Sequence, residues 1–111
     1  MSVVFISHAF TSDPERSARN VAGIAREIVR SGHLPIAPQI YLPQFIDETA
    51  ERDLALRLCL RLVRLSDEVR VFGSISEGMR LEIADARRLG IPVLAGDEDG
   101  RLALTGEPPR R

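Results

Sequence analysis

Short apolar runs alternate with longer amphipathic segments along the chain, and this alternation constrains the fold more than any other feature. Residues 3–6 form a run of β-branched and aromatic residues, which is typical of a strand buried on both faces. Further strands are predicted at residues 34–38, 68–72 and 91–94. Strands that alternate with helices over short connections favour right-handed crossovers, so the sequence predicts a parallel sheet covered by helices on both sides.

The segments between these strands carry signals for helix ends. Asp13, Pro14 and Glu15 supply an N-cap, a proline at the first helical position and an acid in the first turn. Apolar residues then recur at three- and four-residue spacing as far as Gly32, which we expect to end the helix. Another helix is predicted over residues 78–89, before the last strand.

A helix is also predicted over residues 47–65, with Asp47 as its cap, and it holds more leucine than one buried face needs. One stripe is formed by Leu54, Leu58, Leu62 and Leu65, and the apolar residues that fall partly outside it are Leu56, Leu60 and Val63. We therefore predict a second buried face on this helix, against another copy of the chain in a homo-oligomer.

The expected architecture is a small flavodoxin-like or Rossmann-like α/β fold of three layers, with four to five mainly parallel strands. The prolines in residues 34–38 suit an edge strand, and residues 102–104 are expected to add a further edge strand. A chain of 111 residues holds one hydrophobic core. A single domain is therefore predicted over residues 1–104, followed by a solvated tail over residues 105–111.

Composition excludes several functional classes. The chain has 15 basic and 16 acidic residues and a net charge of -1, so no excess charge favours a nucleic acid polymer or an anionic membrane. The N-terminal apolar run is short and follows no positive charge, so neither a signal peptide nor a membrane span is expected. The single Cys59 cannot form an internal disulfide, and no metal-ligand, Walker or dinucleotide-binding motif occurs. We expect a cytoplasmic protein with no metal and no cofactor.

The ligands of open parallel sheets bind outside the carboxyl ends of the strands, so the site is expected in the loops there. The polar residues that follow the first three predicted strands are Ser7 and His8, then Gln39 and Tyr41, then Ser74, Ser76, Glu77 and Gly78. We expect these three sets to converge. Residues 76–82 are the most informative, because they place small residues and free backbone N–H groups at a helix N-terminus, where an anion binds. Glu82 lies one turn further along that helix, where desolvation would tune its basicity.

Simpler interpretations of these residues stay open. Ser76 serves equally well as a helix cap, and Glu82 as a solvated helix residue beside two arginines. His8 would then only satisfy a neighbouring backbone group.

The third strand and the segment after it carry a recognisable spacing: Asp67-Glu-Val-Arg-Val-Phe, then Ser76-x-Gly78-x-x-x-Glu82-x-x-x-Ala86-x-x-x-Gly90-x-Pro92-Val93. This spacing resembles the nucleoside 2-deoxyribosyltransferase-like superfamily over almost the whole chain, and most closely its small uncharacterised phage and bacterial members. The resemblance implies an N-glycosidase or deoxyribosyltransferase that acts on a small-molecule nucleoside or nucleotide. It implies that Glu82 attacks or stabilises the anomeric carbon of the sugar, and that Ser76 and Gly78 hold the sugar 5′ end or its phosphate. The other substrate-binding residues are then expected to be Ser7, His8, Gln39, Tyr41, Asp53 and Met79.

Cleavage of an N-glycosidic bond also needs a proton or hydrogen bond for the leaving base. In the family that the chain resembles, a second acid lies on the helix before the third strand, but residues 57–61 contain none. The nearest acids are Glu51 and Asp53. Either the base is held differently, or the protein is a non-catalytic nucleotide-binding or sensing module.

Residues 4–8, which read Val-Phe-Ile-Ser-His, and the following Asp13 resemble the opening box of bacterial TIR domains. Those domains cleave the glycosidic bond of NAD with a glutamate on a helix. The chain is short for a TIR domain, and residues 76–93 fit the transferase-like pattern better. A TIR-like NAD glycohydrolase is therefore a minor alternative.

Overall fold

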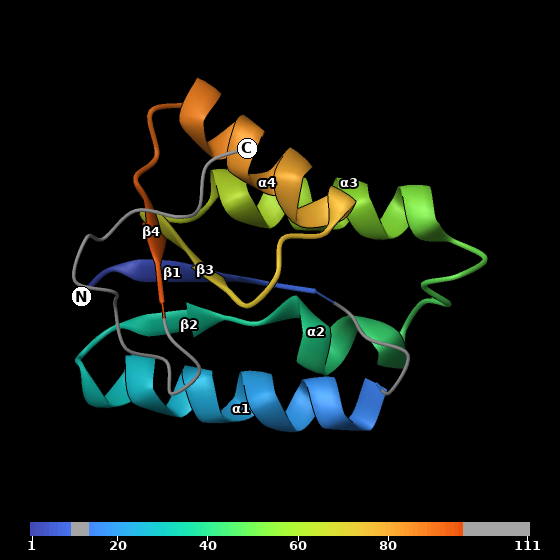
Figure 1. Ribbon diagram of the computed structural model, residues 1–111, viewed down its shortest axis with the longest axis horizontal. Coiled ribbons are helices and arrows are strands. Elements are labelled where there is room, and N and C mark those ends of the chain that lie inside the picture. The colour runs from blue at the N-terminus through green and yellow to red at the C-terminus, as the bar shows by residue number, and fades with distance from the viewer. Residues whose placement is uncertain (10–13, 97–111) are drawn as a thin grey trace.

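The computed structural model describes residues 1–9 and 14–96, and these form three layers around a parallel sheet (Figure 1). The strands are β1 Val3–His8, β2 Leu34–Ile36, β3 Glu68–Phe72 and β4 Val93–Ala95. The helices are α1 Pro14–Arg30, α2 Pro38–Tyr41, the 3-10 turn η1 Leu42–Gln44, α3 Arg52–Arg64 and α4 Glu77–Arg88. The α1 helix covers one face of the sheet, and α3 and α4 lie together over the other. The predicted three-layer α/β fold is confirmed.

The four strands run in the order β2-β1-β3-β4, and each neighbouring pair is parallel. In β1, Phe5 lies opposite Ile36 of β2 on one side and Val69 of β3 on the other. His8 lies opposite Phe72, so β1 and β3 end at the same edge of the sheet. This edge is where the chain leaves β3 towards α4, and it is where the pocket described below opens.

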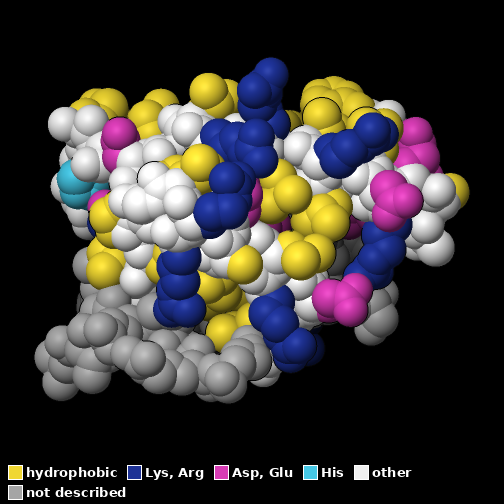
Figure 2. All heavy atoms as spheres, turned by 90° about the horizontal axis from the view of Figure 1, so that it is seen from above, with side chains coloured by type: hydrophobic (Ala, Val, Ile, Leu, Met, Phe, Trp, Pro, Cys, Tyr) yellow, Lys and Arg dark blue, Asp and Glu magenta, His cyan; other side chains and the backbone are white. Residues whose placement is uncertain are grey.

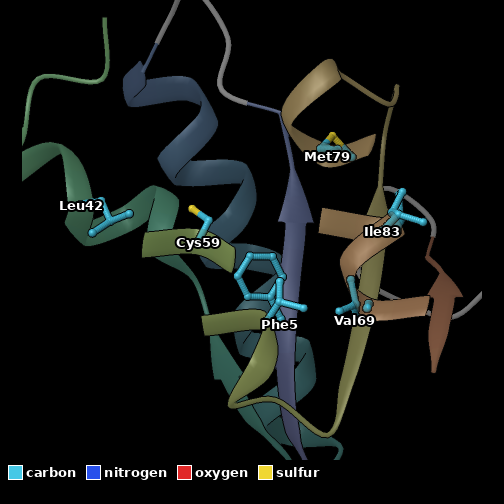
Figure 3. Packing of buried hydrophobic residues seen from close by; sticks show 9 residues of the cluster. Phe5, Leu42, Cys59, Val69, Met79 and Ile83 are labelled. Carbon is cyan, nitrogen blue, oxygen red and sulfur yellow. The ribbon is translucent and has the colours of Figure 1, made fainter. Parts of the chain in front are cut away.

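The core has two parts, one on each face of the sheet. Val4 and Ile6 of β1 pack with α1, whereas Phe5 points to the opposite face, towards α3 and α4. This alternation confirms that β1 is buried on both faces. Figure 3 shows the second part of the core, which contains Phe5 of β1, Cys59 of α3 and Met79 of α4.

Two predicted elements differ from the structure near the carboxyl edge of the sheet. The second strand ends at Ile36, and the expected loop over residues 38–41 is the helix α2, which has Pro38 in its first turn. A proline suits that position because its missing N–H would have no helical partner there. The last strand begins at Val93, two residues later than predicted.

The helix predicted over residues 47–65 begins only at Arg52. Asp47 does act as a cap, but of a separate turn, because its Oδ1 accepts hydrogen bonds from the backbone N–H groups of Thr49 and Ala50 at 2.9 and 3.0 Å. Bonds of this kind offer the backbone an alternative to helix and delay the helix start.

The two predicted sets of apolar residues on α3 are not separated as expected, because Val63, from outside the predicted stripe, is fully buried in the core. Leu58 and Leu62 pack against the core and Leu56 lines the pocket, while Leu65, directly after the helix, is 67% exposed. The predicted cap Asp13, the edge strand at residues 102–104 and the tail at residues 105–111 lie outside the described residues. None of the described helices is long and apolar enough to cross a membrane.

Candidate functional site

A pocket with a volume of about 1120 Å³ lies at the carboxyl edge of the sheet. Among the described residues, its wall comes from four segments: the end of β1, the chain that precedes α3, the first half of α3 and the start of α4. The lining residues of these segments are His8 and Ala9, then residues 43–49, then Arg52, Ala55, Leu56 and Cys59, then residues 76–79 with Leu81 and Glu82. The pocket is therefore at the edge where the sequence predicted a site.

Glu82 is the most constrained polar side chain of this pocket. It is only 8% exposed, and its Oε1 accepts a 2.7 Å hydrogen bond from Oγ of Ser7, which is fully buried at the end of β1. Burial raises the pKa of Glu82 to about 7, and the hydrogen bond from Ser7 opposes that rise. The interpretation of Glu82 as a solvated helix residue is wrong. A carboxyl group with a pKa near neutrality can hold either charge state at physiological pH.

Ser76 caps α4 and also lines the pocket. Its Oγ accepts a hydrogen bond from the backbone N–H of Met79 at 3.2 Å. Helix geometry gives the N–H groups of Glu77 and Gly78 no acceptor within the helix. Gly78 leaves open space, since a Cβ atom there would meet only Oγ of Ser76, at 4.0 Å. The start of α4 can therefore accept an anionic or hydroxylated group from the pocket.

His8 lies on the pocket wall, and its Nδ1 is 2.8 Å from the carbonyl oxygen of Ala9. At this distance the ring nitrogen donates a hydrogen bond to that carbonyl. The interpretation of His8 as a partner of a backbone group therefore agrees with the structure, and the same residue contributes a polar surface to the pocket.

The structure does not bring four of the expected binding residues, Ser7, Gln39, Tyr41 and Asp53, to the pocket wall. Gln39 is buried behind the site, where its Nε2 donates to the carbonyl oxygens of Ile6 and His8 at 2.9 and 3.1 Å. Tyr41 packs against the core and against Phe45, with ring centroids 6.2 Å apart. Asp53 is exposed on α3, outside the lining residues. Gln39 thus supports the end of β1, and Ser7 contacts the site through Glu82.

Three charged residues of the pocket, Asp47, Glu48 and Arg52, were not among the expected site residues. Arg52, the first residue of α3, brings a positive charge to the wall. Glu48 also lines the pocket, and burial raises the pKa of its carboxyl group. In the sequence, Glu48 stands in the first turn of the helix predicted over residues 47–65. An acid at that position is already explained by its favourable interaction with the helix dipole, so it did not indicate a site residue.

Glu48 and Glu82 both act on the thiol of Cys59 in the pocket wall. Burial raises the pKa of Cys59 to about 12, and the negative charges of Glu82 and Glu48 add to this effect. All three residues line the pocket. Among residues 1–9 and 14–96, no group of three or more His, Cys, Asp or Glu side chains is placed to hold a metal ion.

Fold and site together define an α/β protein with a buried carboxyl group in a pocket at the carboxyl edge of a parallel sheet. The family described as "Domain of unknown function (DUF7768)" matches residues 2–95, and the chain belongs to this family. No curated protein matches the sequence.

One similar solved structure is that of a 2-deoxyribosyltransferase from the psychrotolerant bacterium Bacillus psychrosaccharolyticus. The TM-score is 0.66 and the sequence identity 14%, over 93% of this chain and 77% of the other. At this identity the likeness establishes a shared fold. The fold implied by the spacing of residues 67–93 is therefore confirmed.

Proposed function

We propose that this protein cleaves the N-glycosidic bond of a small-molecule nucleoside or nucleotide, as a hydrolase or as a deoxyribosyltransferase, with Glu82 acting at the anomeric carbon. The observation that carries the proposal is the burial of Glu82 in the pocket with its Oε1 fixed by Ser7. The fold shared with a 2-deoxyribosyltransferase and the spacing of residues 76–93 support the same chemistry.

The proposed chemistry uses the ionised form of Glu82. As the glycosidic bond lengthens, the sugar gains oxocarbenium character, and a carboxylate stabilises that charge or captures the anomeric carbon as an ester. Exclusion of water by the bound ligand would strengthen this stabilisation. The hydrogen bond from Ser7 favours the ionised form and orients the carboxylate. Water or an acceptor base then takes the sugar from the ester.

The proposed position of the sugar follows from the pocket wall. The turn at residues 76–78 would hold the 5′ end of the sugar or its phosphate through backbone N–H groups. Arg52, on the same wall, would add a positive charge for a phosphate. His8 and the apolar side chains of Leu56 and Leu81 would contact the rest of the ligand.

The test is incubation of the purified protein with nucleosides, deoxynucleoside monophosphates and NAD, with free base measured by chromatography. Glu82→Gln is the matched variant, because it keeps the shape and the acceptor for Ser7 while removing the charge. We expect base release by the wild type and a loss of about 100-fold or more in the variant. Equal release by both proteins would exclude the role of Glu82. Binding without release would instead favour the nucleotide-binding module.

We also propose a homo-oligomer formed through α3 and the adjacent outer surface of α4. Figure 2 shows that this side of the molecule carries apolar patches between arginine side chains. Leu65 and Leu89, after the ends of α3 and α4, are 67% and 43% exposed. Leu65→Glu should convert the oligomer to a monomer in light-scattering mass measurements. A monomeric wild type at micromolar concentration would contradict the proposal.

A further inference from the structure

We propose that Glu48 is the acid that protonates the leaving base, so that Glu48 and Glu82 together form the catalytic pair of the pocket. This inference rests on the proposed glycosidase or transferase function. It supplies the second acid that residues 57–61 lack, from a different place in the chain: the turn between η1 and α3.

The backbone around Glu48 is fixed by its two acidic neighbours. Asp47 accepts hydrogen bonds from the N–H groups of Thr49 and Ala50, and Oε1 of Glu51 accepts one from the N–H of Asp47 at 3.0 Å. Asp47 and Glu51 thus use their carboxylates within the turn. Glu48 is the acid of this turn that has a carboxyl oxygen shielded from solvent, and the residue lines the pocket.

The carboxyl group of Glu48 lies in an environment that favours its neutral form. Its Oε1 is shielded from solvent and has no hydrogen-bond partner within the described part of the chain. A shielded oxygen without a donor is unfavourable for a carboxylate, whereas a protonated carboxyl group carries less charge to solvate. A neutral acid with an unused hydrogen-bonding group is what a leaving base requires.

Glu48 and Glu82 reach the pocket from different elements, and Cys59 lines the same pocket. Both line the pocket, and both raise the pKa of Cys59. The two carboxyl groups differ in their hydrogen bonds. Ser7 donates a hydrogen bond to Glu82, whereas Oε1 of Glu48 has no partner within the described residues. Pairs of carboxyl groups whose surroundings treat them differently are suited to separate acid and base or nucleophile roles.

Other acids near the pocket fit the role less well. Hydrogen bonds from the Ala50 and Thr49 N–H groups lower the pKa of Asp47, which keeps that carboxyl group ionised. Glu77 is exposed at the start of α4. The carboxylate of Glu51 is bonded to the backbone and does not line the pocket.

The proposed reaction has two steps, cleavage of the bond to the base and hydrolysis of the ester with Glu82. The carboxyl O–H of Glu48 gives its proton to a ring nitrogen of the base while the bond between that nitrogen and the anomeric carbon breaks. The electron pair of this bond stays on the base, which leaves neutral, and an oxygen of Glu82 bonds to the anomeric carbon. Water then attacks that carbon, the ester bond to Glu82 breaks, and the proton of the water returns to Glu48.

The test compares two leaving groups in wild type, Glu48→Gln and Glu82→Gln. The first substrate is the nucleoside or nucleotide found by base release, and the second is the corresponding 4-nitrophenyl glycoside, whose leaving group needs no proton. We expect Glu48→Gln to lose about 100-fold or more in kcat/KM on the first substrate and less than tenfold on the second. Glu82→Gln should lose activity on both. The alkaline limb of the pH–rate profile should also vanish in Glu48→Gln.

Glu15→Gln, on the exposed surface of α1, is the matched control and should behave as wild type. Thermal melting of each variant separates a loss of catalysis from a loss of fold. If the wild type is active and Glu48→Gln loses activity equally on both substrates, or loses none, the role of Glu48 alone is overturned. A wild type that releases base from no nucleoside or nucleotide and cleaves no 4-nitrophenyl glycoside would overturn the proposed function and this role together.

Discussion

Ser7 and Glu82 lie 75 positions apart in the sequence, and a 2.7 Å hydrogen bond joins their side chains at the carboxyl end of β1. Both residues are buried, so the bond forms where water cannot replace it. It connects the central strand of the sheet to the helix that carries the proposed catalytic carboxylate. The charge state of Glu82 therefore depends on a residue that does not line the pocket.

Replacing Ser7 by alanine should raise the pKa of Glu82 above its value of about 7, because the lost hydrogen bond favours the ionised form. If activity needs the carboxylate, the acidic limb of the pH–rate profile should move to higher pH. A pH series of kcat/KM measures the shift. Ser31→Ala is the matched control, since Ser31 is exposed and donates to the carbonyl of Glu27. An unmoved limb in Ser7→Ala would separate this bond from catalysis.

Glu82→Gln should make the protein more stable than wild type at pH 8 and change stability little near pH 4. The folded-state pKa of about 7 lies above the ordinary value of 4.5. The unfolded chain therefore loses this proton first, and the contribution of Glu82 to stability falls as pH rises from about 4.5 to about 7. Such a shift corresponds to roughly 3 kcal/mol in the free energy of unfolding.

Urea unfolding of both proteins at pH 4, 6 and 8 measures this difference. The gain in Glu82→Gln should grow over this range and level off above pH 7. A variant that is less stable than wild type at pH 8 would mean that the ionised carboxylate has favourable partners in the folded state.

Gly96→Ala should destabilise the protein by about 1–3 kcal/mol through overpacking. A Cβ atom at this position would lie 2.0 Å from Cε1 of Phe72, a buried ring between the sheet and α1. Gly23→Ala is the opposite case, because within the described part of the chain no atom outside the backbone of α1 itself lies within 4 Å of its Cβ position. That change should stabilise the helix by up to about 1 kcal/mol. Melting temperatures of the two variants should move in opposite directions.

The sequence predicted the parts of the site that depend on short-range patterns. The strand at residues 3–6 follows from β-branched residues buried on both faces, and the cap at Ser76 follows from small polar residues before an amphipathic segment. Because parallel strands end at one edge, the approach of Ser7 to the start of α4 was also predictable in outline. The position of Glu82 four residues after Gly78 left both a site residue and a solvated helix residue open, and its burial is a finding of the structure.

Other parts of the site depend on competition between a helix and a turn for the same residues, and the sequence does not reveal which of the two forms. Asp47 is a good helix cap, so residues 47–51 fit a helix start, yet its hydrogen bonds to Thr49 and Ala50 form a separate turn. That turn determines where Glu48 lies. The position of Gln39 could not be predicted for a similar reason. The short helix α2 replaces the expected loop, and the side-chain amide of Gln39 is buried against the end of β1.

Gly78→Ala should weaken ligand binding while leaving the fold intact. The new methyl group would meet only Oγ of Ser76, at 4.0 Å, so melting temperature should change little. The same methyl group would occupy space beside the N-terminus of α4 in the pocket wall, where the sugar 5′ end or its phosphate is proposed to bind. We expect KM or Kd to rise about tenfold, with the larger effect on the phosphorylated ligand. Unchanged affinity for nucleoside and nucleotide alike would place the 5′ end elsewhere in the pocket, and Arg52→Ala would then be the variant that locates it.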